Sequence, residues 1–134
     1  MDSSVAPVSS SWSAVGSPLR WALALAATVS AVAHIPPTPE HLVEAPYMGV
    51  GFVAFTLTCL ALAAAALVRD SAVVYRSAAA VCGAGIATYA ATRLVSFPLL
   101  SDDVGNWLEP LGVVSVLAEA VVVVASLRAL SRRA

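Results

Sequence analysis

Glu119 lies in the middle of a long apolar run and is the side chain with the clearest chemical implication. On a helix it would be about 15 Å from Glu109 and about 13 Å from Arg128, near the middle of that run. A charged side chain at the centre of a bilayer costs about 2.5–3.5 kcal/mol on insertion scales, so such a residue faces a protein interior. We interpret Glu119 either as a carboxyl that handles protons or cations, or as a structural hydrogen-bonding contact between helices.

Two histidines and several carboxylates form a second candidate group, in the polar segments between the apolar runs. His34 ends the first run, and His41 and Glu44 are three residues apart, so a helical turn would place them on one face. Imidazole and carboxylate groups are ligands for zinc, copper and iron. We predict a metal or cation site at this rim, formed by His34, His41, Glu44, Asp102 and Asp103. The alternative is that exposed loops are simply polar.

Stripes of polar and small residues are expected on two helices, because their members recur at three- and four-residue steps. The first comprises Glu109, Gly112, Ser115, Glu119 and Ser126, and the second comprises Cys82, Gly85, Tyr89 and Arg93. Arg93 lies about one turn inside the end of its run, where it can reach an acidic group at the same level. The acidic groups at that level are Glu109, Asp102 and Asp103. We expect a structural ion pair here in preference to an anion-binding site.

Both cysteines lie at a depth similar to that of Glu119. Cys59, Cys82 and Glu119 are each nine residues from one end of a run, which corresponds to about 13 Å along a helix. Two thiols and a carboxyl can bind a soft metal ion. The competing interpretation is that both cysteines are small buried apolar residues, which is the common role of a free cysteine.

The composition places these residues in a membrane protein. Of 134 residues, 60% are hydrophobic and 11% are charged, and the mean hydropathy is +0.88. Soluble domains average about 45–50% apolar and about 25% charged residues. A soluble enzyme, a disordered chain and a disulfide scaffold are therefore excluded. The chain has seven Lys and Arg residues in all and no basic stripe, which also excludes a nucleic-acid partner.

Four apolar runs are long enough to cross a bilayer, at about 19–35, 46–68, 73–97 and 107–130. They predict an all-α, integral membrane four-helix transmembrane bundle over residues 18–134, preceded by a mobile tail over residues 1–17. The lipid bilayer is the expected environment. Small residues crowd the runs, which favours close helix packing and a homo-oligomer or a partner membrane subunit.

The arginines predict the orientation. With four spans, six of them fall on one side: Arg20, Arg69, Arg76, Arg128, Arg132 and Arg133. The opposite loops, Pro36–Ala45 and Pro98–Asn106, contain no arginine and four carboxylates. Because positive charge is retained in the cytoplasm, both termini are predicted there (N-in/C-in) in a multi-pass protein of the bacterial inner membrane.

A secretory signal is a competing interpretation of the first run. Arg20, the apolar residues that follow it and Ala31-Val32-Ala33 have the order of a signal peptide with its cleavage site. Cleavage there would leave His34 as a new amino terminus, which is a good copper chelate. The long region before Arg20 carries no further positive charge, so we favour an uncleaved span.

Two stretches, HLVEAPYMG at residues 41–49 and DDVGNWLEPLG at residues 102–112, resemble segments of small four-span membrane proteins of high-GC bacteria. That resemblance implies a membrane location and four helices, and it implies no catalytic activity. Small multidrug transporters are similar in size and span number, but their essential Glu lies in the first span, whereas Glu119 lies in the fourth.

The sequence therefore predicts a small membrane protein that binds a metal (Cu, Zn or Fe) or another cation at the rim, with Glu119 as a proton-linked group. Two alternatives remain: an accessory or scaffold subunit with no chemistry of its own, and a small proton-coupled transporter. No phosphate-binding loop, nucleophile elbow or haem-attachment motif is present, which favours a role other than catalysis.

Overall fold

The computed structural model describes residues 17–134, which form helices and no strand. The elements are α1 (Pro18–His34), α2 (Thr38–Glu44), α3 (Pro46–Val68), α4 (Ala72–Leu94), the short 3-10 helix η2 (Ser101–Asp103) and α5 (Pro110–Ser131). The predicted tail lies, except for Ser17, outside the described residues.

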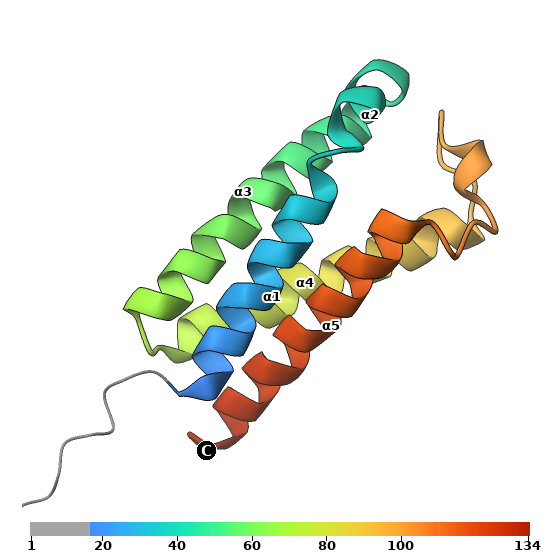
Figure 1. Cartoon of the computed structure of the whole chain (residues 1–134). Helices are drawn as coiled ribbons and strands as arrows, with labels where there is room; N and C mark the ends of the chain where they lie inside the picture. The colour runs from blue at the N-terminus through green and yellow to red at the C-terminus, as the bar shows by residue number, and fades with distance from the viewer. Residues whose placement is uncertain (1–16) are drawn as a thin grey trace, which may run out of the picture.

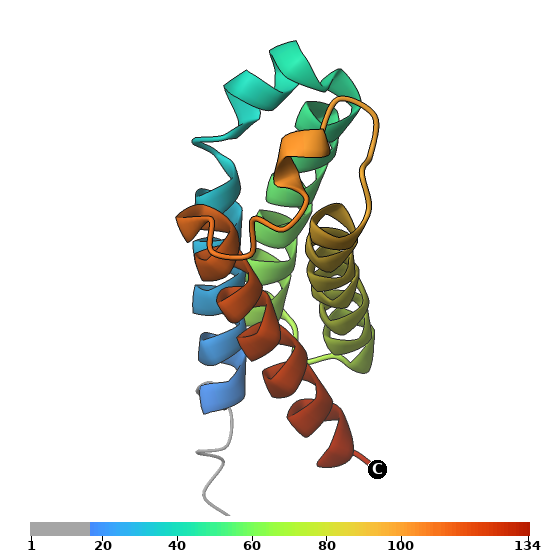
Figure 2. The ribbon, with the colours of Figure 1, turned by 90° about the vertical axis from the view of Figure 1, so that its right-hand side faces the viewer.

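The four long helices run alternately in opposite directions (Figure 1). Helix α1 packs against α3 and α5, and α5 also packs against α4, whereas α3 and α4 pack more loosely against each other. Helix α2 lies at the end of the bundle opposite the C-terminus, and the loop that carries η2 lies at the same end (Figures 1 and 2). We call this the α2 end, and we call the opposite end the arginine end.

The observed helix boundaries follow the prolines. Helix α3 begins at Pro46, as predicted, because proline is well suited to a first helical turn. Helix α5 begins at Pro110, three residues later than the predicted Trp107, since Glu109 before the proline is extended. Helix α4 ends at Leu94, short of the predicted Phe97, because Val95 is already extended.

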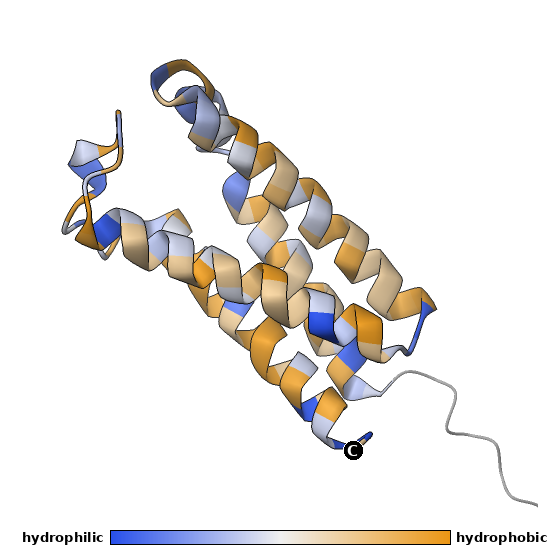
Figure 3. Ribbon diagram, turned by 180° about the vertical axis from the view of Figure 1, so that it is seen from behind, coloured by the Kyte–Doolittle hydropathy of each residue, from blue (hydrophilic) through white to orange (hydrophobic). Residues whose placement is uncertain are grey.

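Two helices, α3 and α5, are long and apolar enough to cross a membrane, and α1 with α2 forms a third if that bent pair, at 47°, is one span. The prediction of four spans is therefore confirmed only in part. Helix α1 has 17 residues, and α4 combines Arg76 and Arg93 with many Ala, Gly and Thr residues, which lowers its hydropathy. Hydrophobic residues predominate along the long helices (Figure 3), and many large apolar side chains are exposed, which is compatible with lipid contact.

Small side chains let the helices approach closely, as in other membrane bundles. The buried core contains many alanines, among them Ala24, Ala27, Ala31, Ala63, Ala66, Ala78, Ala125 and Ala129. Gly49 of α3 is a point of close approach, because an added Cβ would lie 2.6 Å from the backbone nitrogen of Leu42 in α2. An added Cβ on Gly51 would meet nothing within 4 Å.

Gly49→Ala is expected to lower the free energy of unfolding by about 1–3 kcal/mol, because the backbone of α2 must move away. Gly51→Ala is expected to raise it by up to about 1 kcal/mol, since alanine is the better helix former and has room. Unfolding of the protein in detergent micelles by added dodecyl sulfate, followed by circular dichroism, measures both effects. Equal effects of the two substitutions would contradict the observed packing of α2 on α3.

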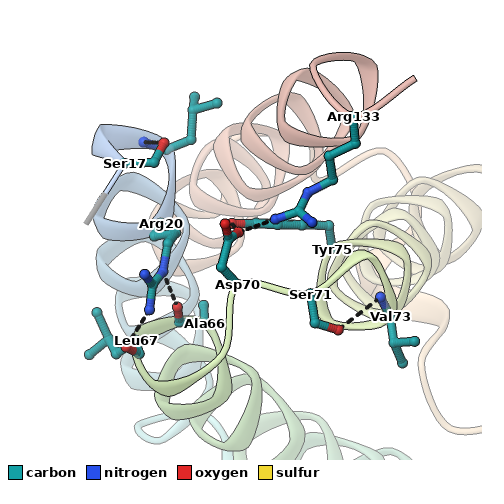
Figure 4. A network of polar contacts seen from close by, with 10 residues as sticks. Ser17, Arg20, Ala66, Leu67, Asp70, Ser71, Val73, Tyr75 and Arg133 are labelled. Atoms are coloured by element: carbon teal, nitrogen blue, oxygen red, sulfur yellow. Dashed lines mark hydrogen bonds and ion pairs between the residues drawn. The ribbon is translucent and has the colours of Figure 1, made fainter. Parts of the chain in front are cut away.

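At the arginine end, polar contacts join the ends of the helices (Figure 4). The Arg20 guanidinium donates from Nε to the carbonyl of Ala66 at 2.7 Å and from a terminal nitrogen to that of Leu67 at 2.5 Å. These carbonyls lie in the last turn of α3, where no intrahelical donor remains and positive charge is favourable. Arg20 therefore binds α1 to the end of α3.

Asp70 forms a second contact at this end. It accepts a hydrogen bond of 2.8 Å from the Tyr75 hydroxyl and pairs with Arg133 near the C-terminus. The Tyr75 hydrogen bond and the Arg133 charge hold the pKa of Asp70 below its ordinary value. The turn between α3 and α4 is thereby joined to the residues that follow α5.

Asp70→Asn is expected to lower stability at pH 7 by less than about 1 kcal/mol, because the ion pair is exposed. A lowered pKa in the folded state means that Asp70 contributes stability above its unfolded pKa and loses it as the pH falls through the folded pKa. The difference between parent and variant should therefore shrink below about pH 4 and vanish on further acidification. A difference that grows with acidity, in the same micelle assay, would contradict this assignment.

Candidate binding cavity

A cavity of about 390 Å³ lies within the α2-end half of the bundle. All five α-helices line it, and so does η2. Glu40, His41 and Asp103 line it at the α2 end, and Glu119 of α5 lies at its deepest level. A volume of about 300–1,000 Å³ is typical of sites for small molecules.

Glu119 is 1% exposed, and its two carboxyl oxygens have different surroundings. Oε1 accepts hydrogen bonds from the Ser115 hydroxyl at 2.6 Å and from the Ser30 hydroxyl of α1 at 3.0 Å. Oε2 has no hydrogen-bond partner among the residues that the structure describes. It lies beside Gly85 of α4, and an added Cβ there would be 2.7 Å from Oε2 and 2.8 Å from the ring of Phe55. Since Gly85 and Phe55 both line the cavity, the free oxygen is on the cavity side of the carboxyl group.

The two histidines are both held by backbone carbonyls. His34 Nδ1 is 2.8 Å from the carbonyl oxygen of Ser30, and His41 Nδ1 is 2.9 Å from that of Pro37. A carbonyl oxygen only accepts, so Nδ1 carries the proton in both rings, and in the neutral ring Nε2 keeps its lone pair. Both rings lie against Phe52, with centroid distances of 5.0 Å for His34 and 4.8 Å for His41.

Aromatic side chains form much of the remaining wall. Phe52 and Phe55 come from α3, and Tyr89 comes from α4. An aromatic face attracts a cation, which adds to the area that the ring buries. The Arg93 guanidinium already lies in this way over Tyr89, 4.4 Å from the ring centroid.

At the α2 end, Arg93 holds the loop between α4 and α5. Its guanidinium pairs with Asp103 of η2 at 2.8 Å, which confirms the predicted structural ion pair. Its backbone carbonyl accepts from the amide of Gly105 at 2.9 Å, and the φ of Gly105 is +79°, a conformation that favours glycine. The Tyr89 hydroxyl donates to the carbonyl of Trp107 at 2.9 Å. The loop thereby forms one wall of the cavity mouth.

The length of the cavity follows from the residue spacing on α4. Gly85 is beside Glu119, and Arg93 is eight residues further along the same helix. At 1.5 Å per residue, the carboxyl group and the guanidinium are at levels about 12 Å apart. The charges that line the cavity are four carboxylates, Glu40, Asp103, Glu109 and Glu119, and one guanidinium, Arg93. The excess of carboxylates favours a cation inside.

The cavity brings together most of the residues predicted from the sequence as candidates. His34, His41, Asp103, Glu119, Arg93, Tyr89 and Glu109 all line it, whereas Glu44 and Asp102 do not. Glu109 also caps α5, accepting from the amides of Leu111 at 3.0 Å and Gly112 at 2.5 Å. Within residues 17–134 no three His, Cys, Asp or Glu side chains are grouped as a metal centre requires. Metal binding therefore stays a prediction.

Cys59 and Cys82 are buried free thiols outside the cavity lining. They are neighbours of each other, and Glu119 is near both. The similar depth predicted for the three residues agrees with this arrangement. The two cysteines do not form, with Glu119, a group of the kind that a metal centre requires, and no such group occurs within residues 17–134.

The sequence did not predict a role for Ser30, which hydrogen-bonds to Glu119, or for Phe52 and Phe55, which line the cavity. Ser30 precedes His34 by four residues, and this spacing of two polar residues in an apolar run was a usable signal. The two phenylalanines gave no signal, because aromatic residues in an apolar run are equally suited to lipid contact.

No protein-family model, curated protein or solved structure matches this chain. Over residues 17–134 the protein is all-helical, and two to three of these helices are apolar enough to span a membrane. Its interior holds a buried carboxyl group in a partly aromatic cavity.

Proposed function

We propose that all four long helices cross the membrane and that both termini lie in the cytoplasm of a bacterial cell. The support is the alternation of helix direction, together with six arginines at the arginine end and none in the two loops of the α2 end. Charged arginine side chains near the helix ends compensate for the short α1 and the less apolar α4. The cavity then opens on the outer side. The resemblance to small four-span proteins of high-GC bacteria implies a membrane location and four helices, which agrees with this proposal.

We propose that the protein binds a small organic amine that has an apolar body, and that the Glu119 carboxylate pairs with the ammonium group. The observation that carries this proposal is the free Oε2 of a carboxyl group that is 1% exposed and lines a cavity. A buried acceptor without a partner costs free energy, which a ligand donor recovers. An ammonium group supplies both the donor and the compensating charge.

The remaining features of the cavity suit the same ligand. Phe52, Phe55 and Tyr89 present apolar surface for its body and favourable faces for its charge. The excess of carboxylates raises the local concentration of cations at the mouth. A length of about 12 Å between the levels of Glu119 and Arg93 accommodates a short chain or one aromatic ring with a linker.

A second candidate is a soft metal ion bound by imidazole groups. His34 and His41 are both fixed with Nε2 available, which is the arrangement that orients metal-binding histidines. Met48 lines the same cavity, and a thioether favours Cu(I). This function needs the two imidazoles and does not need Glu119, whereas amine binding needs Glu119. A scaffold subunit needs neither the imidazoles nor Glu119 for its function. A proton-coupled transporter would bind the amine and also move it across the bilayer.

Three ligands of matched shape test the proposal: phenylbutylamine, phenylbutanol and phenylbutyrate. Equilibrium dialysis against the purified protein in micelles is expected to show saturable, one-to-one binding of the amine. The alcohol and the carboxylate should bind at least about tenfold more weakly, since neither brings a positive charge to Glu119. Equal affinities for the amine and the alcohol would refute the role of the carboxylate.

A further inference from the structure

The cavity reaches the side of the bundle between α3 and α4 as well as the α2 end. Four residues line the cavity and are also exposed: Glu40 at the α2 end, and, on the side, Gly51 of α3 with Ala84 and Thr88 of α4. The three on the side are small, and an added Cβ on Gly51 would meet nothing within 4 Å. Helices α3 and α4 diverge from their connecting turn toward the α2 end (Figure 1), in agreement with their loose packing. We call Gly51, Ala84 and Thr88 the side opening.

The side opening is close to the level of the buried carboxyl group. Ala84 is next to Gly85, which touches Glu119, and Thr88 is one turn closer to the α2 end. Gly51 is one turn from Phe55 in the same direction along α3. With α3 and α4 in the membrane, the opening faces hydrocarbon about five residues, or about 8 Å, inside the first residue of α3. A group at Glu119 can therefore connect to the lipid without passing the mouth.

We propose that the natural ligand is a long-chain amine dissolved in the bilayer. Its ammonium group binds Glu119, and its alkyl chain leaves through the side opening into the lipid. This inference rests on the proposed amine binding and names the class of amine. It follows from three observations together: a free acceptor at the cavity floor, a passage lined by the small residues Gly51, Ala84 and Thr88, and an outer face of α3 that carries several large exposed apolar side chains.

Substitution of Gly51 by tryptophan tests the inference, because the indole would block the side opening. The protein is reconstituted in phosphatidylcholine vesicles, and binding of dodecylamine and phenylbutylamine is measured by dialysis. The dodecyl chain is longer than the cavity, whereas phenylbutylamine fits inside and can enter from the α2 end. Gly51→Trp is expected to weaken dodecylamine binding at least about tenfold and to change phenylbutylamine binding less than about threefold.

Gly83→Trp is the matched control. Gly83 also has nothing within 4 Å of an added Cβ, but it does not line the cavity, so neither affinity should change. Equal effects of Gly51→Trp on the two amines, or no effect on either, would overturn the side opening and leave amine binding intact. Failure of the parent protein to bind either amine would overturn the proposed function itself.

A second measurement reports where the alkyl chain lies, independently of any variant. Dodecylamine with a nitroxide at the far end of its chain is bound to the parent protein in vesicles. Relaxation of the bound label is expected to be enhanced by oxygen, which concentrates in lipid, and to be little affected by a water-soluble nickel chelate. The opposite order would place the chain toward the aqueous mouth and overturn the inference.

Discussion

Glu119→Gln is expected to lower the affinity for phenylbutylamine by about 10- to 100-fold and to leave the helical content unchanged. The range corresponds to about 1.5–3 kcal/mol, the usual value of a hydrogen bond to a charged group. The glutamine carbonyl can still accept from Ser30 and Ser115, as Oε1 does in the parent. The substitution therefore removes the charge and keeps the contacts between α1 and α5.

Glu44→Gln is the matched control, because it makes the same chemical change on α2 outside the cavity lining. Its amine affinity should equal that of the parent. Ser126→Ala provides a second control on α5 itself, since Ser126 is buried, has no hydrogen-bond partner and does not line the cavity. If Glu119→Gln bound the amine as tightly as the parent, the carboxyl group would have a structural role only. That result would favour the alternative of a scaffold subunit.

Helix type, order and approximate limits could be predicted from the sequence, because apolar runs of about twenty residues allow little else. Pro46 fixed the start of α3 through a local steric rule. The end of α4 at Leu94 and the start of α5 at Pro110 each differ by three residues from the prediction. The reason is that the loop between these helices makes contacts of its own, which end one helix early and delay the next. Arg93 and Gly105 make such a contact, and it joins segments that no local pattern relates.

The candidate site could be predicted from the sequence where its residues lie on the same helix. The spacing of Glu109, Ser115 and Glu119 places them on one face of α5, and the structure confirms that face as a cavity wall. Contacts between helices could not be predicted, because the spacing of residues along one helix does not give its rotation relative to another helix. The pairing of Ser30 with Glu119 therefore had to come from the structure.

The same limit explains why the five-residue metal rim was predicted. His41 and Glu44 are three residues apart on α2, but His41 points toward Phe52 and lines the cavity, and Glu44 does not. Asp103 is already paired with Arg93, whereas Asp102 is exposed. The residue types alone suggest metal ligands, whereas the directions of these side chains depend on how α2 and η2 lie on the bundle.

Asp103→Asn is expected to lower the free energy of unfolding by about 2–3 kcal/mol, the largest effect on stability among the loop carboxylates. Its partner Arg93 is 7% exposed, and Nε of that guanidinium has no hydrogen-bond partner among the described residues. Removing the carboxylate leaves a buried charge uncompensated, which typically costs about 3–5 kcal/mol. The expected cost is lower because Asp103 is 26% exposed, so water can replace part of the interaction.

Asp102→Asn is the neighbouring control and should change stability by less than about 0.5 kcal/mol, as exposed substitutions usually do. Replacing both partners, in an Arg93→Met and Asp103→Leu double variant, should recover most of the loss, because no buried charge then remains. The micelle unfolding assay measures all three variants. A double variant as unstable as Asp103→Asn would mean that the loop depends on the ion pair itself and not on neutralisation of Arg93. In that case Arg93 would be essential for holding the wall of the cavity mouth in place.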